Sequence, residues 1–115
     1  IELLKLEDGR YVFEAAMTAT ANLGSSEQIM FVVGATQTEY FERIRKAAPD
    51  HFLLIPGVGA QGGQLTDLKG LMTPETGIIV NSSRQIIYAS SGEDFAEASA
   101  HEAEKLQIQM SEMMV

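Results

Sequence analysis

The sequence contains no cysteine, few basic residues and no long hydrophobic run. Without cysteine there can be neither a disulfide nor a thiolate metal site, which fits a reducing compartment such as the cytoplasm. Eight basic residues against 16 acidic ones give a formal net charge of −8. That charge argues against nonspecific binding to nucleic acid or to an acidic membrane. The longest apolar run is too short to cross a bilayer. A small anionic ligand is still compatible, because one arginine and a few backbone N–H groups can hold a phosphate.

Three short, continuously apolar segments predict buried strands. They lie at residues 30–33, 52–55 and 78–80 of the 115-residue chain. None alternates apolar with polar residues, and such runs are typical of a parallel sheet covered by helices. Amphipathic helical patterns lie around the strands, at residues 12–23, 41–48 and from 91 onward. Alternating strands and helices predict an α/β fold with right-handed parallel connections.

Local signals set the expected helix ends. Thr36-Gln-Thr-Glu39 matches a capping box before the second helix, and Pro49 ends it. In the last helix, Leu106, Met110 and Met113 fall on one face and predict core packing.

Two segments admit an alternative structure. Residues 3–13 could form a hairpin around Asp8-Gly9, and residues 78–88 could form a hairpin with Arg84 solvated at its tip.

A sheet of three parallel strands would leave hydrogen-bonding edges and apolar faces exposed. We therefore expect this chain to be part of a larger sheet or barrel. A complete (β/α)₈ barrel takes about 250 residues, of which this chain would supply under half. The chain begins at Ile1 rather than at methionine. Processing and a longer parent chain both explain this, and the organisation favours the longer chain.

The second apolar run leads into Gly57-x-Gly59-x-x-Gly62, which matches the dinucleotide fingerprint G-x-G-x-x-G. The Rossmann version needs a helix that begins within the glycines and an acidic residue at the end of the next strand. Here a short stretch follows the glycines, and the third apolar run ends in Asn81 and two serines. The residues therefore favour another kind of phosphate loop.

A phosphate site makes better use of the same residues. Two consecutive strands end in small, polar loops, at residues 57–63 and 81–84. In barrels, the loops after the last two strands form a standard phosphate site. Glycines let backbone N–H groups approach an anion, Gln61 can donate a side-chain N–H, and Arg84 can donate two parallel hydrogen bonds.

At these motifs the sequence resembles a known family. FLLIPGVGAQGG at residues 52–63, followed by IIVNSSRQIIYA at 78–89, is similar to the C-terminal part of orotidine 5′-phosphate decarboxylase. The likeness is strongest to the bacterial subfamily with an Asn-Ser-Ser-Arg phosphate loop, and FVVGAT at residues 31–36 resembles that family's sixth strand.

The resemblance implies a (β/α)₈ (TIM) barrel, of which residues 1–115 would be the C-terminal part, with about strands six to eight and their helices. It implies that Gln61, Ser83 and Arg84 bind the substrate phosphate and that Pro56 and Gly57 line the nucleotide pocket. The enzyme would convert orotidine 5′-phosphate to UMP, work as a homodimer, and need no metal or organic cofactor. It would bind neither nucleic acid nor a membrane.

The family's catalytic array of aspartates and lysine has no match in this chain, so we expect it in the missing N-terminal half. His51 and His101 are expected to be surface side chains rather than metal ligands. Two other functions fit the same phosphate loops. One is a different barrel enzyme, such as a sugar-phosphate lyase or epimerase, and the other is a non-catalytic phosphate-binding fragment.

Overall fold

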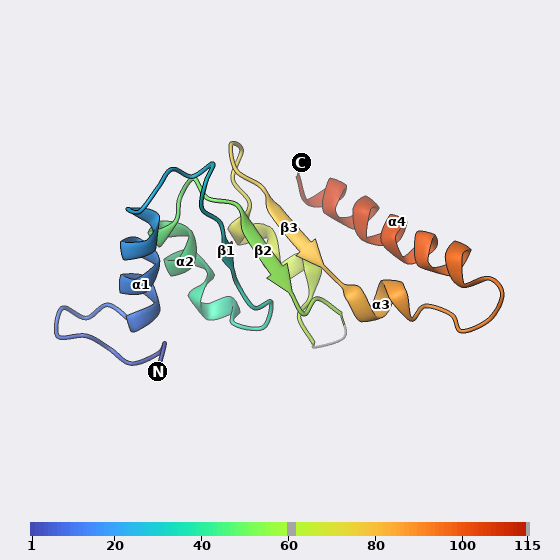
Figure 1. The fold of residues 1–115 in the computed structure, drawn as a ribbon, viewed down its shortest axis with the longest axis horizontal. Coiled ribbons are helices and arrows are strands. Elements are labelled where there is room, and N and C mark those ends of the chain that lie inside the picture. The colour runs from blue at the N-terminus through green and yellow to red at the C-terminus, as the bar shows by residue number, and fades with distance from the viewer. Residues whose placement is uncertain (60–61, 115) are drawn as a thin grey trace.

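The fold of the computed structural model, which describes residues 1–59 and 62–114, is a parallel three-stranded sheet with helices packed along it (Figure 1). The elements are α1 (Val12–Ala21), β1 (Phe31–Val32), η1 (Thr38–Tyr40), α2 (Phe41–Ala47), β2 (Leu53–Pro56), η2 (Leu65–Leu71), β3 (Ile78–Asn81), α3 (Ser83–Ile87) and α4 (Phe95–Met113). The strands have the order β1-β2-β3, and both pairs are parallel. The three apolar runs therefore form the expected strands.

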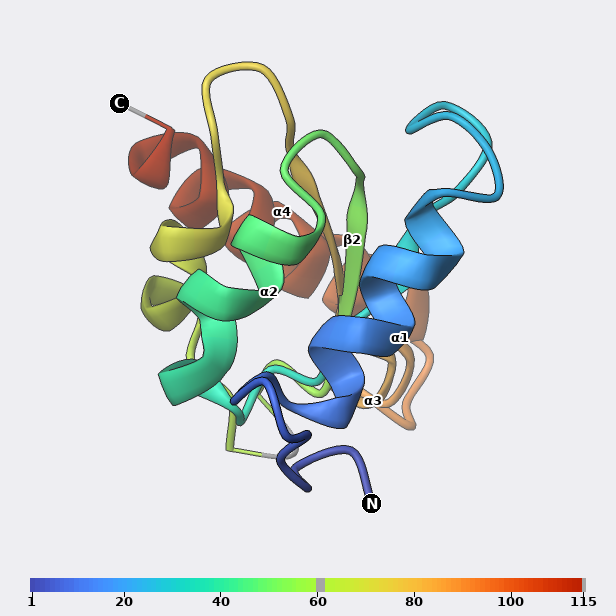
Figure 2. The ribbon, with the colours of Figure 1, turned by 90° about the vertical axis from the view of Figure 1, so that its left-hand side faces the viewer.

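The helical layer follows the order of the strands. Helix α1 packs on α2, α2 packs on η2, and η2 packs on α4. Figure 2 shows α1 and α2 side by side in front of the sheet. The core lies between this layer and one face of the sheet, where Leu53, Ile55, Leu68 and Leu71 are fully buried. Each strand is thus followed by a helical segment on the same side, as in successive βα units.

The opposite face of the sheet is left bare by this chain. The register aligns Val32, Leu54 and Ile79 across the three strands. Val32 is 68% exposed and Ile79 is 47% exposed, although both are large and apolar. The Cα radius of gyration is 16.1 Å, against about 13 Å for a compact domain of roughly 100 residues. The helices of this chain cover only one face of the sheet, which leaves the other apolar face exposed, as expected for part of a larger barrel.

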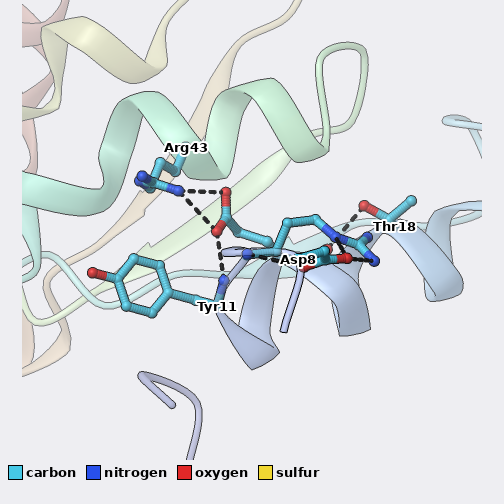
Figure 3. Close-up of polar contacts among 6 residues, drawn as sticks. Asp8, Tyr11, Thr18 and Arg43 are labelled. Atoms are coloured by element: carbon cyan, nitrogen blue, oxygen red, sulfur yellow. Dashed lines mark hydrogen bonds and ion pairs between the residues drawn. The ribbon is translucent and has the colours of Figure 1, made fainter. Parts of the chain in front are cut away.

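Polar contacts fix α1 against α2 (Figure 3). The Glu14 carboxylate accepts a hydrogen bond from the Tyr11 backbone N–H at 2.8 Å and pairs with Arg43 of α2 at 3.0 Å. The Arg43 guanidinium also lies 5.2 Å from the centroid of the Tyr11 ring. The Glu14 carboxylate therefore caps the N-terminus of α1 and joins the two helices.

Several local predictions need correction. The capping box at residues 36–39 is wrong, because residues 38–40 form a 3₁₀ turn and no side chain caps α2. Residues 3–13 form a turn at Gly9 with one antiparallel bridge, Lys5 to Tyr11, rather than a hairpin of two strands. The hairpin alternative for residues 78–88 is wrong, because α3 follows β3 directly.

His51 is buried, not at the surface as predicted, and its ring packs 5.4 Å from that of Phe31. Its ring nitrogens have no hydrogen-bond partner among the described residues. His101 is exposed, as expected.

Candidate functional site

A small pocket forms where β2 and β3 end. The register pairs Pro56 with Asn81, so the segments after the two strands begin side by side. The pocket has a volume of about 160 Å³ and is lined by Pro56, Gly57, Val58, Asn81, Ser82, Ser83 and Arg84. Because parallel strands have their carboxyl ends at one edge of a sheet, loops distant in sequence meet here.

The glycine loop after β2 needs glycine for its backbone conformation. Gly57, Gly59 and Gly62 have φ angles of 90°, 80° and 86°, a region that side chains disfavour. The loop also closes on itself, since the Gly59 N–H donates to the Gly63 carbonyl at 2.9 Å. Among the residues of this segment that the structure describes, none begins a helix, and η2 starts only at Leu65. The dinucleotide interpretation is therefore excluded by the local structure.

Position 63 has no room for a side chain. A Cβ at this position would lie 2.4 Å from the Ala35 Cβ and 3.2 Å from the carbonyl oxygens of Ala35 and Gly57. The backbone of Gly63 thus rests on the segment after β1, and this contact fixes the far side of the glycine loop.

We expect Gly63→Ala to lower the free energy of unfolding by about 1–3 kcal/mol, the usual cost of overpacking a tight site. Gly70→Ala is the matched control, because a Cβ there meets nothing within 4 Å. Thermal unfolding of the protein measures both. Equal melting temperatures for the two variants would contradict the contact with Ala35.

The turn from β3 into α3 places Ser83 and Arg84 at the mouth of the pocket. Ser82 is buried, and its hydroxyl donates to the Val58 carbonyl at 2.9 Å, which joins the two loops. The Ser83 hydroxyl donates to the Asn81 side-chain oxygen at 2.9 Å. Arg84 is exposed, and within residues 1–59 and 62–114 its guanidinium makes no ion pair. The pocket lining therefore carries one positive charge and no carboxylate.

Two further properties concern the described residues as a whole. No three histidine, aspartate or glutamate side chains there gather in a way that could hold a metal ion. None of the helices that the structure describes is both long enough and apolar enough to pass through a bilayer.

Comparison with known proteins confirms the resemblance to orotidine 5′-phosphate decarboxylase. No family model matches the chain. Orotidine 5′-phosphate decarboxylase of Phocaeicola vulgatus is 46% identical over 114 residues, or 98% of this chain and 42% of the relative. The Flavobacterium johnsoniae protein of the same name is 46% identical over 108 residues, or 93% of this chain and 40% of the relative. The chain therefore matches the orotidine 5′-phosphate decarboxylases over part of their length.

Solved structures agree with that match. The Leishmania donovani OMP decarboxylase superimposes with a TM-score of 0.72 at 26% identity, over 93% of this chain and 41% of that one. A Toxoplasma gondii crystal structure has a TM-score of 0.74 over 98% of this chain and 46% of that one. At 22% identity, the second match bears on the fold alone. The fold is accordingly part of a (β/α)₈ barrel of the orotidine 5′-phosphate decarboxylase type, as predicted.

The chain spans less than half the length of the curated orotidine 5′-phosphate decarboxylases that it matches. Four of the five predicted site residues, Pro56, Gly57, Ser83 and Arg84, line the one pocket at the ends of β2 and β3. The fifth, Gln61, lies outside the described residues. The structure thus brings the four together, and their roles toward a substrate are still predictions.

Two residues that hold this pocket together were not predicted. Ser82 joins β3 to the glycine loop, and Gln85 lies behind it, with its side-chain oxygen 3.2 Å from the Ser82 hydroxyl. Ser82 could have been found from its place inside the Asn-Ser-Ser-Arg motif. Gln85 carries no such signal, because its partners are fixed only by the packing of α3.

Proposed function

We propose that this chain supplies the phosphate-binding part of an enzyme that decarboxylates orotidine 5′-phosphate to UMP in pyrimidine biosynthesis. The observation that carries the proposal is the shared pocket of Pro56, Gly57, Ser83 and Arg84 at two neighbouring strand ends. Curated proteins named orotidine 5′-phosphate decarboxylase, 46% identical to this chain, support the proposal.

In this proposal the Arg84 guanidinium donates hydrogen bonds to the phosphate oxygens, because its planar fork matches a tetrahedral oxyanion. The backbone N–H groups of Ser83 and Arg84 complete the cradle, and the Gln61 amide donates from the glycine loop. Pro56 and Gly57 line the side toward the nucleoside. The pocket of about 160 Å³ suits a phosphate group, whereas sites for whole small molecules measure about 300–1,000 Å³.

The remainder of the substrate would therefore lie against residues outside this chain. We propose that residues 1–115 are the C-terminal part of one barrel domain, and that the N-terminal part packs on the bare face of Val32, Leu54 and Ile79. Burial of three large apolar side chains there would add about 1.5–3 kcal/mol for each one fully buried. The N-terminal part would also bring the catalytic aspartates and lysine.

The reaction breaks the bond between the pyrimidine ring and its carboxylate, which leaves as carbon dioxide. The bonding electrons stay on the ring carbon, and the lysine ammonium of the N-terminal part supplies the proton that completes UMP. The phosphate does not react. Its contacts with Arg84 and the glycine loop hold the base in place, so binding energy at a distance raises the rate of the chemical step.

We further propose that the enzyme works as a homodimer in the cytoplasm and without a metal or organic cofactor. The absence of cysteine from this chain is compatible with a reducing compartment. Analytical ultracentrifugation of the intact protein would test the dimer.

Activity of the intact protein tests the proposed function. With orotidine 5′-phosphate we expect stoichiometric formation of UMP and carbon dioxide, followed by the change in ultraviolet absorbance. A chelator should leave the rate unchanged. Tight binding of UMP without turnover of orotidine 5′-phosphate would contradict the decarboxylase and leave a phosphate-binding protein.

A further inference from the structure

A chain of polar contacts runs from the glycine loop to the last helix, with the single Ser82 hydroxyl proton shared between two acceptor oxygens. The Ser82 hydroxyl lies 2.9 Å from the Val58 carbonyl oxygen and 3.2 Å from the Gln85 side-chain oxygen. The Gln85 Nε2 donates to the Glu102 carboxylate of α4 at 2.9 Å. Lys105, one turn further along α4, pairs with the same carboxylate. Gln85 is thus the link between the two loops and α4.

The ionised carboxylate fixes the orientation of the Gln85 amide. Hydrogen bonds from Lys105 and then from Gln85 lower the pKa of the Glu102 carboxyl from its ordinary value, so Glu102 is charged at neutral pH. A carboxylate only accepts hydrogen bonds, so the NH₂ group of Gln85 must face it. The amide oxygen of Gln85 is then directed at Ser82 and the glycine loop.

That oxygen lies directly against the backbone of the glycine loop. A Cβ on Gly59 would come within 2.4 Å of the Gln85 Oε1 and 3.6 Å of the Ser82 hydroxyl. Because Gly59 has a φ of 80°, the turn is one that few other residues adopt. The Gln85 amide therefore contacts the loop at a residue whose backbone conformation favours glycine.

Helix α4 gives this support a rigid base. Besides the bond from Gln85 to Glu102, the Ser99 hydroxyl of α4 donates to the Ile86 carbonyl of α3 at 2.7 Å. Leu106, Met110 and Met113 pack the other end of α4 on the core. Gln85 follows Arg84 directly in α3, so movement of Gln85 would also move the arginine.

We propose that Gln85 is a positioning residue for phosphate binding, which holds the glycine loop and Arg84 in fixed relation through Ser82 and Glu102. The role rests on the proposed function, because the bound group is the substrate phosphate. Gln85 itself does not line the pocket.

The test compares the binding of UMP with that of uridine, which lacks the phosphate, to the intact protein. Gln85→Leu should weaken UMP binding about tenfold, because the net contribution of one hydrogen bond corresponds to a change of about tenfold in the dissociation constant. Uridine binding should change by less than about twofold. Gln107→Leu is the matched control, because Gln107 is exposed on α4 and bonds only within that helix. Its UMP affinity should equal that of the unaltered protein.

A reciprocal pair separates positioning from folding. Gln85→Glu places two carboxylates together and should weaken UMP binding further than Gln85→Leu. Adding Glu102→Gln restores one amide and one carboxylate in exchanged places, and should recover most of the UMP affinity. Equal losses for UMP and uridine, or a double variant no better than Gln85→Glu, would overturn the positioning role.

The test also distinguishes the two proposals. If the unaltered protein does not bind UMP, the proposed function and the role of Gln85 both fail. If it binds UMP and Gln85→Leu binds it equally well, only the role of Gln85 fails.

Discussion

Replacing Arg84 by alanine in the intact protein should lower kcat/KM for orotidine 5′-phosphate by about 100-fold or more. Charge-assisted hydrogen bonds contribute roughly 1.5–3 kcal/mol each, and a planar guanidinium can form two to one phosphate. Among the described residues, the pocket lining contains no second cation that could compensate. Because phosphate contacts also orient the base, kcat should fall together with the affinity. Steady-state rates over a range of substrate concentrations measure both.

Arg84→Lys and Arg43→Ala complete this experiment. Lysine keeps the charge but loses the bidentate geometry, so an intermediate rate is expected. Arg43 pairs with Glu14 on the outer helices and lines no part of the pocket, so Arg43→Ala should keep kcat/KM within about twofold. If Arg84→Ala retains the unaltered kcat/KM, Arg84 does not bind the phosphate.

Replacing Arg45 by methionine should lower the free energy of unfolding by about 3–5 kcal/mol, because several carbonyl oxygens would lose their donor at about 1–3 kcal/mol for each buried unsatisfied group. Arg45 is 9% exposed, and its guanidinium donates to four backbone carbonyls. Two of these bonds reach the Leu71 oxygen, at 2.6 and 2.9 Å. The others reach the oxygens of Ala48 at 3.0 Å, His51 at 2.8 Å and Pro49 at 3.4 Å. Methionine fills similar space but leaves these oxygens without their donor.

The charge of Arg45 is held by carbonyl oxygens at the ends of α2 and η2, where the helix dipoles are negative. Burial lowers the pKa of its guanidinium from the ordinary value, and attraction to Asp50 opposes that shift. The side chain stays protonated at neutral pH, since arginine loses its proton only far above it.

Thermal unfolding of the intact protein checks this effect, and Tm should fall by about 6–20 °C for a protein of about 250 residues. Lys46→Met is the matched control, because Lys46 is the next residue on α2 and is exposed. Its free energy of unfolding should change by no more than about 0.5 kcal/mol. Similar Tm values for Arg45→Met and Lys46→Met would show that the buried bonds of Arg45 contribute little.

Local chemistry made the sheet and its loops predictable. Residues 52–55 are continuously apolar and lead into proline and glycine, so the strand and its end are both marked in one short segment. The same holds for residues 78–80 before Asn81. Since parallel strands end at one edge, the meeting of Gly57 and Arg84 in a pocket could also be expected.

Two predictions are wrong where the local sequence fits more than one structure. Residues 78–88 read equally well as a hairpin, because the apolar pairs around Asn81 to Arg84 fit two strands. The backbone instead turns into α3, which packs on α4. The turn at His51 predicts a surface side chain, yet the ring is buried and packs against Phe31 of β1.

The sequence alone determined the α/β class, the three parallel strands and the two polar loops that follow β2 and β3, because these depend on neighbouring residues along the chain. Tertiary structure alone decided the partners of Arg45, Ser82 and Gln85. Their bonds reach 26, 24 and 17 positions along the sequence, to Leu71, Val58 and Glu102. Each of these hydrogen bonds forms only when donor and acceptor come within about 3 Å, and packing of the helices on the sheet sets that distance.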